Sequence, residues 1–247
     1  MDKLIIKKLL SLNREFYAAF AQPFAASRSV SDPALTAILP HIPQRARVLD
    51  VGCGNGRLAL LLDRERPGAI YLGLDAEPAL IEAARAQSKR LTNISAQFHT
   101  ADVVQPNWTS DFGRRTLITC LAVLHHIPSF ELRARVLRDM AGLLTPEGRL
   151  ILSTWQFLNS ARLRRKIVNW AKVGIAEEGL EHGDYLLDWK RGGRGLRYCH
   201  LVDEMEVEEL AAESGMAVHE TFHAGGKEGN LSLFAVLKVC QPPTREV

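Results

Sequence analysis

The chain has 247 residues, of which 47% are hydrophobic and 24% charged, and its formal net charge is +3 at pH 7. This length and balance predict one large folded core and exclude a disordered chain or a small disulfide-stapled scaffold. No apolar run is long enough to cross a bilayer, so we expect no membrane association. The four cysteines lie far apart, which predicts neither a metal site nor disulfides and favours a cytoplasmic location.

Basic residues are concentrated in residues 155–200. This segment holds nine basic and five acidic residues, a local net charge of +4, whereas the remainder of the chain carries −1. Residues 157–176 contain no acidic residue at all. Such a patch is typical of segments that meet phosphates, and a solvated helix face explains it as well.

The first predicted element is an amphipathic helix near the N-terminus. Apolar side chains recur there at steps of three and four: Ile5, Leu9, Leu12, Phe16 and Phe20. Asp32 followed by Pro33 then predicts the capped start of a second, short helix. We expect residues 1–45 to form a helical lid, with Tyr17 and Phe24 folded over a bound ligand.

From residue 46 onward, short apolar runs alternate with helical patterns. The predicted strands are 47–51, 70–74, 96–99, 116–121 and 149–153, and the predicted helices are 57–63, 78–86 and 131–144. This alternation is typical of βαβ units around a parallel sheet, so the fold class is a doubly wound α/β fold. We assign residues 46–154 to this core.

The alternation stops after Ser153, which predicts a basic insertion over residues 155–200 on the substrate side. It resumes with a helical pattern at 203–214, ended by Gly215, and two strand patterns at 216–221 and 231–239. Gly225 and Gly226 mark a turn between these strands. We expect residues 201–240 to complete the sheet with a helix and a hairpin.

A glycine-rich loop follows the first predicted strand. The sequence VLDVGCGNG places Asp50 at the strand end, then three glycines at alternate positions, then a helix. Glycines let backbone N–H groups approach a ligand closely, next to a helix N-terminus. The spacing is GxGxG and not GxGxxG, and the chain holds no GxxxxGK[ST] loop, which argues against dinucleotide and nucleoside triphosphate sites. Asp50 would repel a pyrophosphate but suits a cationic ligand with an amino group.

Two more acids follow the next two predicted strands. Asp75 lies some 20 residues after the loop, where a carboxylate can accept hydrogen bonds from a ribose diol. Asp102 follows the third strand, where it could accept from an adenine amino group. Each acid alone could be a turn residue or a helix cap. Three acids at successive strand ends favour a binding site.

These motifs resemble those of the class I S-adenosylmethionine-dependent methyltransferases with a methyltransferase type 11 domain. The matching segments are VLDVGCGNGRL, LGLDAEPALIEAAR, TADV and LAVLHHIPSFELRARVLRDMAGLLTPEGRLILS. The resemblance implies a Rossmann-like, seven-stranded, mostly parallel sheet with helices on both faces, strand order 3-2-1-4-5-7-6, an antiparallel strand 7 and an insertion after strand 5. It also implies S-adenosyl-L-methionine as cofactor, bound by Arg28, Asp50, Gly52, Cys53, Gly54, Asn55, Gly56, Asp75, Ala76, Asp102, Val103, Leu121, Ala122 and His126.

The flanking segments resemble a narrower family, the eukaryotic tRNA wobble-uridine carboxymethyl methyltransferases. The likeness covers residues 12–28, 184–190, 196–201, 208–210 and 228–231. In that family an RYYH segment lies near the substrate side of the cofactor, and here it reads Arg197, Tyr198, Cys199 and His200, with Cys199 in place of an aromatic residue. The resemblance implies tRNA as the acceptor and a small zinc-binding activator protein as a possible partner.

The catalytic candidates follow from the expected acceptor. A carboxylate is already a nucleophile at neutral pH, so Arg197 and His200 need only position it, with Tyr198 shaping the pocket. The fourth strand ends near His125 and not in the Asn/Asp-Pro-Pro-Tyr pattern of amine-directed enzymes, which favours oxygen or carbon acceptors. His125 and His126 are candidate general bases, although such histidines also pack beside the methionine moiety or cap the next helix.

Two alternatives remain open. A small-molecule O- or C-methyltransferase would use the insertion as a lid over a mostly apolar pocket. A non-enzymatic binding module would keep the fold as a scaffold. The tryptophans Trp155, Trp170 and Trp189 could stack on bases or pack within the insertion.

Overall fold

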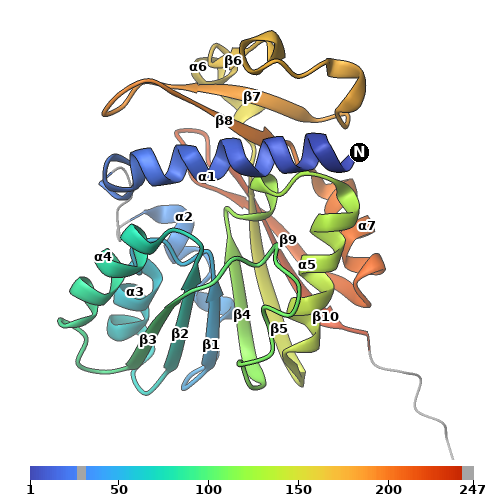
Figure 1. Ribbon diagram of the computed structural model, residues 1–247. Helices are drawn as coiled ribbons and strands as arrows, with labels where there is room; N and C mark the ends of the chain where they lie inside the picture. Colours follow the sequence, from blue (N-terminus) through green and yellow to red (C-terminus); the bar gives the residue numbers. More distant parts are fainter. Residues whose placement is uncertain (27–31, 241–247) are drawn as a thin grey trace, which may run out of the picture.

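A seven-stranded sheet forms the centre of the computed structural model, which describes residues 1–26 and 32–240 (Figure 1). Its strands are β1 (Arg47–Val51), β2 (Ile70–Asp75), β3 (Ser95–Thr100), β4 (Arg115–Leu121), β5 (Leu144–Trp155), β9 (Met216–Ala224) and β10 (Ser232–Val239). They lie in the order β3-β2-β1-β4-β5-β10-β9. The strands β1 to β5 pair in parallel, and β10 is antiparallel to both of its neighbours. The predicted strand order and the antiparallel seventh strand are confirmed.

Helices cover both faces of this sheet. They are α3 (Arg57–Glu65), α4 (Pro78–Ser88), α5 (Phe130–Gly142) and α7 (Glu204–Glu213). Neighbouring side chains of β1 point into different cores: Val48 packs with residues of α3 and α4, and Leu49 with residues of α5 and α7. Because both faces are buried, the central strands are apolar throughout instead of alternating.

The insertion folds into a small second sheet, which the sequence analysis did not predict. The insertion also contains α6 (Ala161–Arg164). Its sheet consists of the antiparallel strands β6 (Ile167–Val168), β7 (Asp184–Trp189) and β8 (Gly195–His200), in the order β6-β7-β8. Most side chains of β7 and β8 are buried on both faces, so these strands lack the alternation that would have marked them. Figure 1 shows this sheet above the ends of the central strands.

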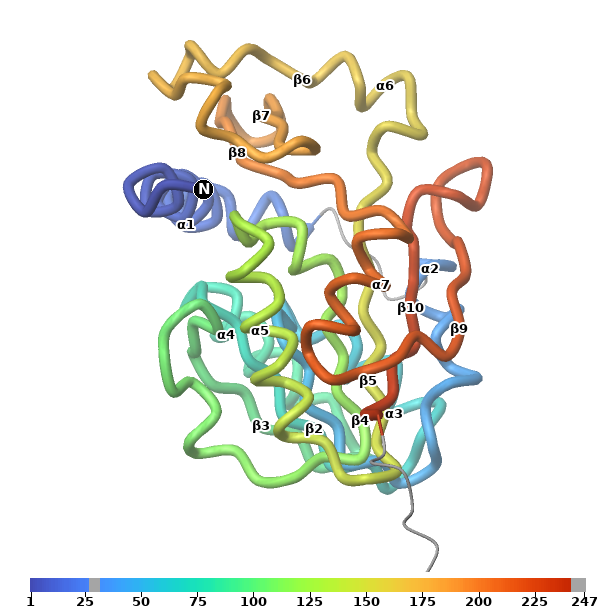
Figure 2. Tube along the Cα trace, turned by 90° about the vertical axis from the view of Figure 1, so that its right-hand side faces the viewer, coloured from blue at the N-terminus to red at the C-terminus, as the bar shows by residue number. Residues whose placement is uncertain are grey.

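The helix α1 (Lys3–Ala25) lies between the insertion and the central sheet (Figures 1 and 2). The apolar stripe predicted for this segment buries Leu9, Phe16 and Phe20, and the helix kinks at Phe20 ahead of Pro23. The side chain of Asp32 caps α2 (Pro33–Thr36), as predicted, by accepting from Ala34 N–H at 3.0 Å. Among the described residues no helix, α1 included, is long and apolar enough to span a membrane.

Candidate active site

A cavity of about 380 Å³ opens at the carboxyl ends of β1, β2 and β4, the edge where doubly wound sheets bind ligands. The glycine loop forms its floor, and the acids after β2 and β3 stand on its wall. The roof is α1, which contributes Asn13, Arg14 and Tyr17, together with Phe24. Residues of α1 therefore share this cavity with the glycine loop.

Most of the residues expected to bind the cofactor come together here. The lining includes Asp50, Gly52, Cys53, Gly54, Asn55, Asp75, Ala76, Asp102, Val103, Leu121, Ala122 and His126. Gly56 is not among the lining residues: it caps α3 with φ +78°, and a Cβ there would lie 3.0 Å from the Phe98 ring. Its glycine serves the turn and the packing behind the loop. Arg28 lies outside the described residues.

The backbone of the glycine loop leaves room for a ligand. Gly52 and Gly54 have φ of +72° and +56°, the left-handed region that favours glycine. A Cβ on Gly52 would lie 2.2 Å from a methyl carbon of Val123, whereas a Cβ on Gly54 would meet no atom within 4 Å. Gly54 N–H donates to a carboxylate oxygen of Asp75 at 2.9 Å. The loop is thus held against the second acid, with open space above Gly54 that fits a small ligand.

Asp50 is a buried carboxylate at the end of β1. It is 3% exposed, and its two oxygens accept hydrogen bonds from the Thr119 hydroxyl at 2.7 Å and the Tyr71 hydroxyl at 2.5 Å. Burial raises the pKa of Asp50 to about 6, and these two hydrogen bonds oppose the rise. A cationic ligand beside Asp50 would favour its ionised form. The arrangement suits the amino group predicted for the ligand.

The other two acids are held by local hydrogen bonds and by the roof. Asp75 accepts from Glu77 N–H at 3.0 Å, and its burial raises the pKa of this carboxyl. Asp102 pairs with Arg14 of α1, with 2.7 Å between the guanidinium and the carboxylate. Sequence reasoning missed Arg14, because a basic residue on the polar face of an amphipathic helix looks like a solvated one.

The two histidines after β4 make different contacts. The Nδ1 of His126 lies 3.2 Å from the Tyr198 carbonyl, which can only accept, so Nδ1 carries the proton. In the neutral ring the other nitrogen, Nε2, then accepts from the Tyr17 hydroxyl at 2.8 Å. His125 is buried and does not line the cavity, and its Nδ1 accepts from Trp155 N–H at 3.3 Å.

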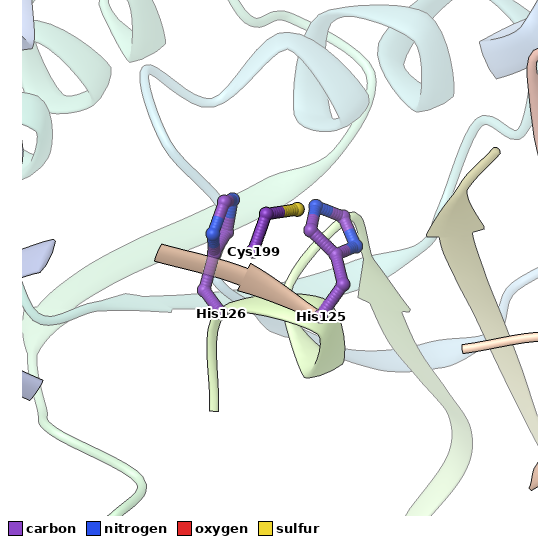
Figure 3. Close-up of side chains that lie close together, drawn as sticks. All are labelled: His125, His126 and Cys199. Carbon is purple, nitrogen blue, oxygen red and sulfur yellow. The ribbon is translucent and has the colours of Figure 1, made fainter. Parts of the chain in front are cut away.

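Figure 3 shows His125, His126 and Cys199 side by side, with the sulfur of Cys199 between the two rings. One ligand atom of each lies within 4.8 Å of the others, a spacing that suits a zinc ion. Burial raises the pKa of the Cys199 thiol to about 12, and zinc binds the thiolate. Without a metal ion, the buried Cys199 thiol therefore keeps its proton at neutral pH.

Successive side chains of β8 point to opposite faces of the strand. Arg197 therefore lies on one face, and Tyr198 and His200 lie on the other. Arg197 is 7% exposed, and its guanidinium carbon lies 4.8 Å from the Trp155 ring centre, 5.4 Å from that of Phe16 and 5.5 Å from that of Trp189. Within the described part of the chain this guanidinium forms no ion pair. A buried cation among aromatic rings, without an acidic partner, is a place for an anion.

Tyr198 and His200 point into a buried polar network away from the cavity. The His200 ring nitrogens lie 2.6 Å from an Asp184 carboxylate oxygen and 2.8 Å from one of Glu206, and the Tyr198 hydroxyl donates to Asp184 at 2.8 Å. Although burial opposes the charged ring, these contacts raise the pKa of His200. Arg133 of α5 joins the network through Glu206 and Glu181. The side chains of Tyr198 and His200 do not line the cavity, and their catalytic role stays a prediction.

The family model described as a methyltransferase domain matches residues 18–221 of the chain. The chain belongs to this methyltransferase family. The methyltransferase class expected from the sequence is thereby confirmed. The methyltransferase also has the fold of a SAM-dependent methyltransferase from Methanosarcina mazei, with a TM-score of 0.65 at 19% identity, over 83% of this chain and 98% of that one.

Curated relatives of the methyltransferase carry different names. It is 26% identical over 139 residues to a tRNA (carboxymethyluridine(34)-5-O)-methyltransferase of Arabidopsis thaliana, covering 56% of this chain and 31% of the relative. It is 37% identical over 109 residues to a ubiquinone biosynthesis O-methyltransferase of Coxiella burnetii, covering 43% of this chain and 42% of the relative. A protein of Encephalitozoon cuniculi named "Putative methyltransferase ECU09_1500" is 30% identical over 227 residues, 92% of this chain and 90% of that protein. The chain thus spans less than half of the first two relatives.

Asn13 ties the roof of the methyltransferase site to two other segments, and sequence reasoning missed it. It is 6% exposed, its amide donates to the His126 carbonyl at 3.1 Å, and its oxygen accepts from Tyr198 N–H at 2.9 Å. Asn13→Ala is expected to lower the free energy of unfolding by about 1–3 kcal/mol, because both backbone groups lose their partner. Urea denaturation measures this loss.

Ser11→Ala is the matched control for Asn13. Ser11 lies on the same helix, and its hydroxyl meets only the exposed Glu15 carboxylate, so a change below about 0.5 kcal/mol is expected. Equal unfolding curves for the Asn13 and Ser11 variants would contradict the joining role of Asn13.

Proposed function

We propose that this methyltransferase uses S-adenosyl-L-methionine to methylate a carboxylate on a modified wobble uridine of tRNA. The observation that carries the proposal is the buried guanidinium of Arg197, which has no acidic partner within the described residues and shares a strand face with Cys199. The donor supplies an electrophilic methyl group on its sulfonium. The enzyme's own residues hold donor and acceptor in line.

The cavity residues have separate roles toward the donor. Asp50 binds the amino group, Asp75 the ribose hydroxyls and Asp102 the adenine edge, in the order in which the three strands lie. The open space above Gly54 lets the donor approach the backbone. The roof helix α1 excludes water, and the Arg14–Asp102 pair holds it down.

A carboxylate acceptor needs positioning but no general base, because it is ionised at neutral pH. The planar guanidinium of Arg197 offers parallel N–H donors that match a carboxylate, and the rings around it shield the pair from water. Trp155 links this place to the histidines: its ring centre lies 6.3 Å from that of His125, and His125 and His126 are 4.3 Å apart. The acceptor carboxylate would therefore sit on the histidine side of the cavity.

A small-molecule O-methyltransferase is the second candidate, and the Tyr17–His126 contact favours it. A neutral His126 whose Nε2 accepts from a hydroxyl can also accept a proton from a hydroxyl substrate that replaces Tyr17. The Coxiella relative carries an O-methyltransferase name. The basic insertion and the Arabidopsis relative favour RNA, which is why the tRNA function stands first.

The affinity for the donor is expected to depend on pH through Asp50. Its pKa of about 6 leaves the carboxyl neutral below pH 6, and the neutral form attracts no ammonium group. The Kd should therefore weaken by up to about tenfold per pH unit as the pH falls below 6, and stay nearly level between about pH 7 and 7.5. Calorimetric titrations between about pH 5 and 7.5 measure it. Asp50→Asn should give a weaker Kd without this step, and a level Kd in the unmodified chain would contradict the role of Asp50.

The function is tested by offering labelled donor with three acceptors. These are tRNA that carries 5-carboxymethyluridine at the wobble position, the same tRNA without it, and phenolic quinone precursors. Each reaction is run with and without a cell extract as a source of the proposed activator protein. Base-labile label in the first tRNA alone supports the proposal. Label in the phenols alone would replace it with the second candidate.

A further inference from the structure

We propose that Arg162, Lys166 and Arg191, here called the rim cluster, bind a backbone phosphate of the RNA acceptor beside the Arg197 site. This inference rests on the proposed function. It adds a contact to the RNA acceptor at a phosphate, apart from the carboxylate that reacts. The cluster belongs to the insertion: Arg162 lies on α6, Lys166 directly before β6, and Arg191 in the turn after β7.

The indole ring of Trp189 lies close to two cations, Lys166 of the rim cluster and Arg197. The Lys166 ammonium lies 5.9 Å from the Trp189 ring centre, and the Arg197 guanidinium carbon lies 5.5 Å from the same centre. Partial burial lowers the pKa of Lys166, and the charges of Arg162, Arg197 and Arg191 lower it further, whereas the charge of Asp188 raises it. Four positive charges therefore act on one another within a small region.

One acidic side chain, Asp188, offsets part of the positive charge of this region, because its carboxylate raises the pKa of Lys166. Among the residues that the structure describes, none of the three rim cations forms an ion pair. The nearby Asp188 lies 3.1 Å from Lys190, a different and exposed lysine. Four cations near one shared carboxylate leave an excess of positive charge that costs free energy, and an anion bound among them would recover it.

Hydrogen bonds to two backbone carbonyls fix the chain at Lys166 and Arg191 of the rim cluster. The Lys166 carbonyl accepts from Asp188 N–H at 2.8 Å, which fixes Lys166 beside β7. The Trp189 indole N–H donates to the Arg191 carbonyl at 2.5 Å, which folds the turn back onto the ring. These contacts fix the backbone of Lys166 and Arg191 next to Trp189 and its neighbour Asp188.

The position matches an acceptor that carries both a carboxylate and a phosphate. Trp189 borders the rim cluster through Lys166 and the proposed carboxylate site through Arg197. Its ring also packs on Phe24 of the cavity roof, with 6.4 Å between ring centres. A nucleotide whose modified base reaches Arg197 would place its own phosphate on the rim. The ligand of the cluster is therefore a phosphate ester, and RNA is the source we commit to.

The test measures binding of a fluorescent anticodon stem–loop RNA by anisotropy over a range of salt concentrations. Lys166→Gln is expected to weaken the Kd for RNA about tenfold and to reduce the log–log salt slope by about 0.7–0.9, the loss of one phosphate contact. The Kd for the donor should stay within about twofold. Lys166→Arg should keep the RNA affinity, which shows that the glutamine variant lost a charge and not its fold.

Lys190→Gln is the matched control, because Lys190 lies in the same turn as Arg191 but is paired with Asp188. It should leave the RNA Kd within about twofold. An unchanged salt slope for Lys166→Gln, or an equal loss for Lys190→Gln, would overturn the rim site. So would uridine monophosphate or inorganic phosphate binding as tightly as the RNA, since the ligand would then be a free phosphate.

The outcome is separable from that of the proposed function. RNA binding that depends on Lys166, without methylation of the carboxymethyluridine, would keep the rim site and remove the proposed reaction. Methylation of that tRNA at an unchanged KM in Lys166→Gln would keep the reaction and remove the rim site.

Discussion

Arg197→Ala is expected to lower kcat/KM for the carboxylate acceptor by about 10²–10³-fold, while the Kd for the donor stays within about twofold. Removing one partner of a buried, hydrogen-bonded charge pair costs about 2–5 kcal/mol, and 1.4 kcal/mol is a factor of ten. Arg197 is enclosed by Phe16, Trp155 and Trp189, so water screens the pair poorly. Steady-state kinetics with carboxymethyluridine tRNA give the first quantity and calorimetry the second.

Two further variants separate recognition from packing at this position. Arg197→Lys keeps the charge but loses the planar pair of donors, so it should recover only part of the activity. Arg194→Ala removes an exposed arginine just before β8 and should change kcat/KM less than about threefold. Parallel losses of donor affinity and activity in Arg197→Ala would show that Arg197 only supports the fold. Full activity of Arg197→Ala would remove it from the acceptor site.

Gly54→Ala is expected to weaken the Kd for S-adenosylmethionine by about 10–100-fold. The added Cβ would meet no protein atom within 4 Å, so it disturbs no packing, but it would project from a residue that lines the cavity. Forcing one extra carbon into an occupied site costs about 1–3 kcal/mol. Titration calorimetry measures the affinity, and thermal denaturation shows that the variant folds.

Gly215→Ala is the matched control for the backbone. Gly215 also has a left-handed φ, +73°, and an added Cβ there also meets nothing within 4 Å, but it lies after α7 and outside the cavity lining. Both variants should lose a similar, small amount of stability, about 1 kcal/mol. If the two bind the donor equally well, the space above Gly54 is not the donor site.

Local patterns explain why the core of the fold could be predicted. The strand that ends in Asp50, the glycine loop and the following helix each leave a signal within a few residues, and the structure places β1 over the predicted residues. The strand ends that carry Asp75 and Asp102 then meet at one edge, because parallel strands share their direction. No long-range contact is needed for this inference, and it placed the three acids and the glycine loop at the cavity.

The strands within the insertion could not be predicted in this way. The strands β7 and β8 are buried on both faces, and the stability of the insertion depends on contacts with α1 and on the network around Arg133, more than 40 residues away in the chain. The sequence predicts that Arg197, Tyr198 and His200 act together. In a strand, however, successive side chains point to opposite faces. Arg197 therefore lies among the aromatic rings and His200 in the polar network. Only the register of β8 shows that these two side chains point to opposite faces.

A crystal structure of the methyltransferase with S-adenosylhomocysteine is the most direct measurement of the central claim, that the cavity under α1 binds the donor through the three strand-end acids. The account predicts electron density in this cavity, with the ammonium group within hydrogen-bond distance of Asp50 and the ribose at Asp75. Density at another place, or a filled cavity in which neither carboxylate contacts the ligand, would contradict it.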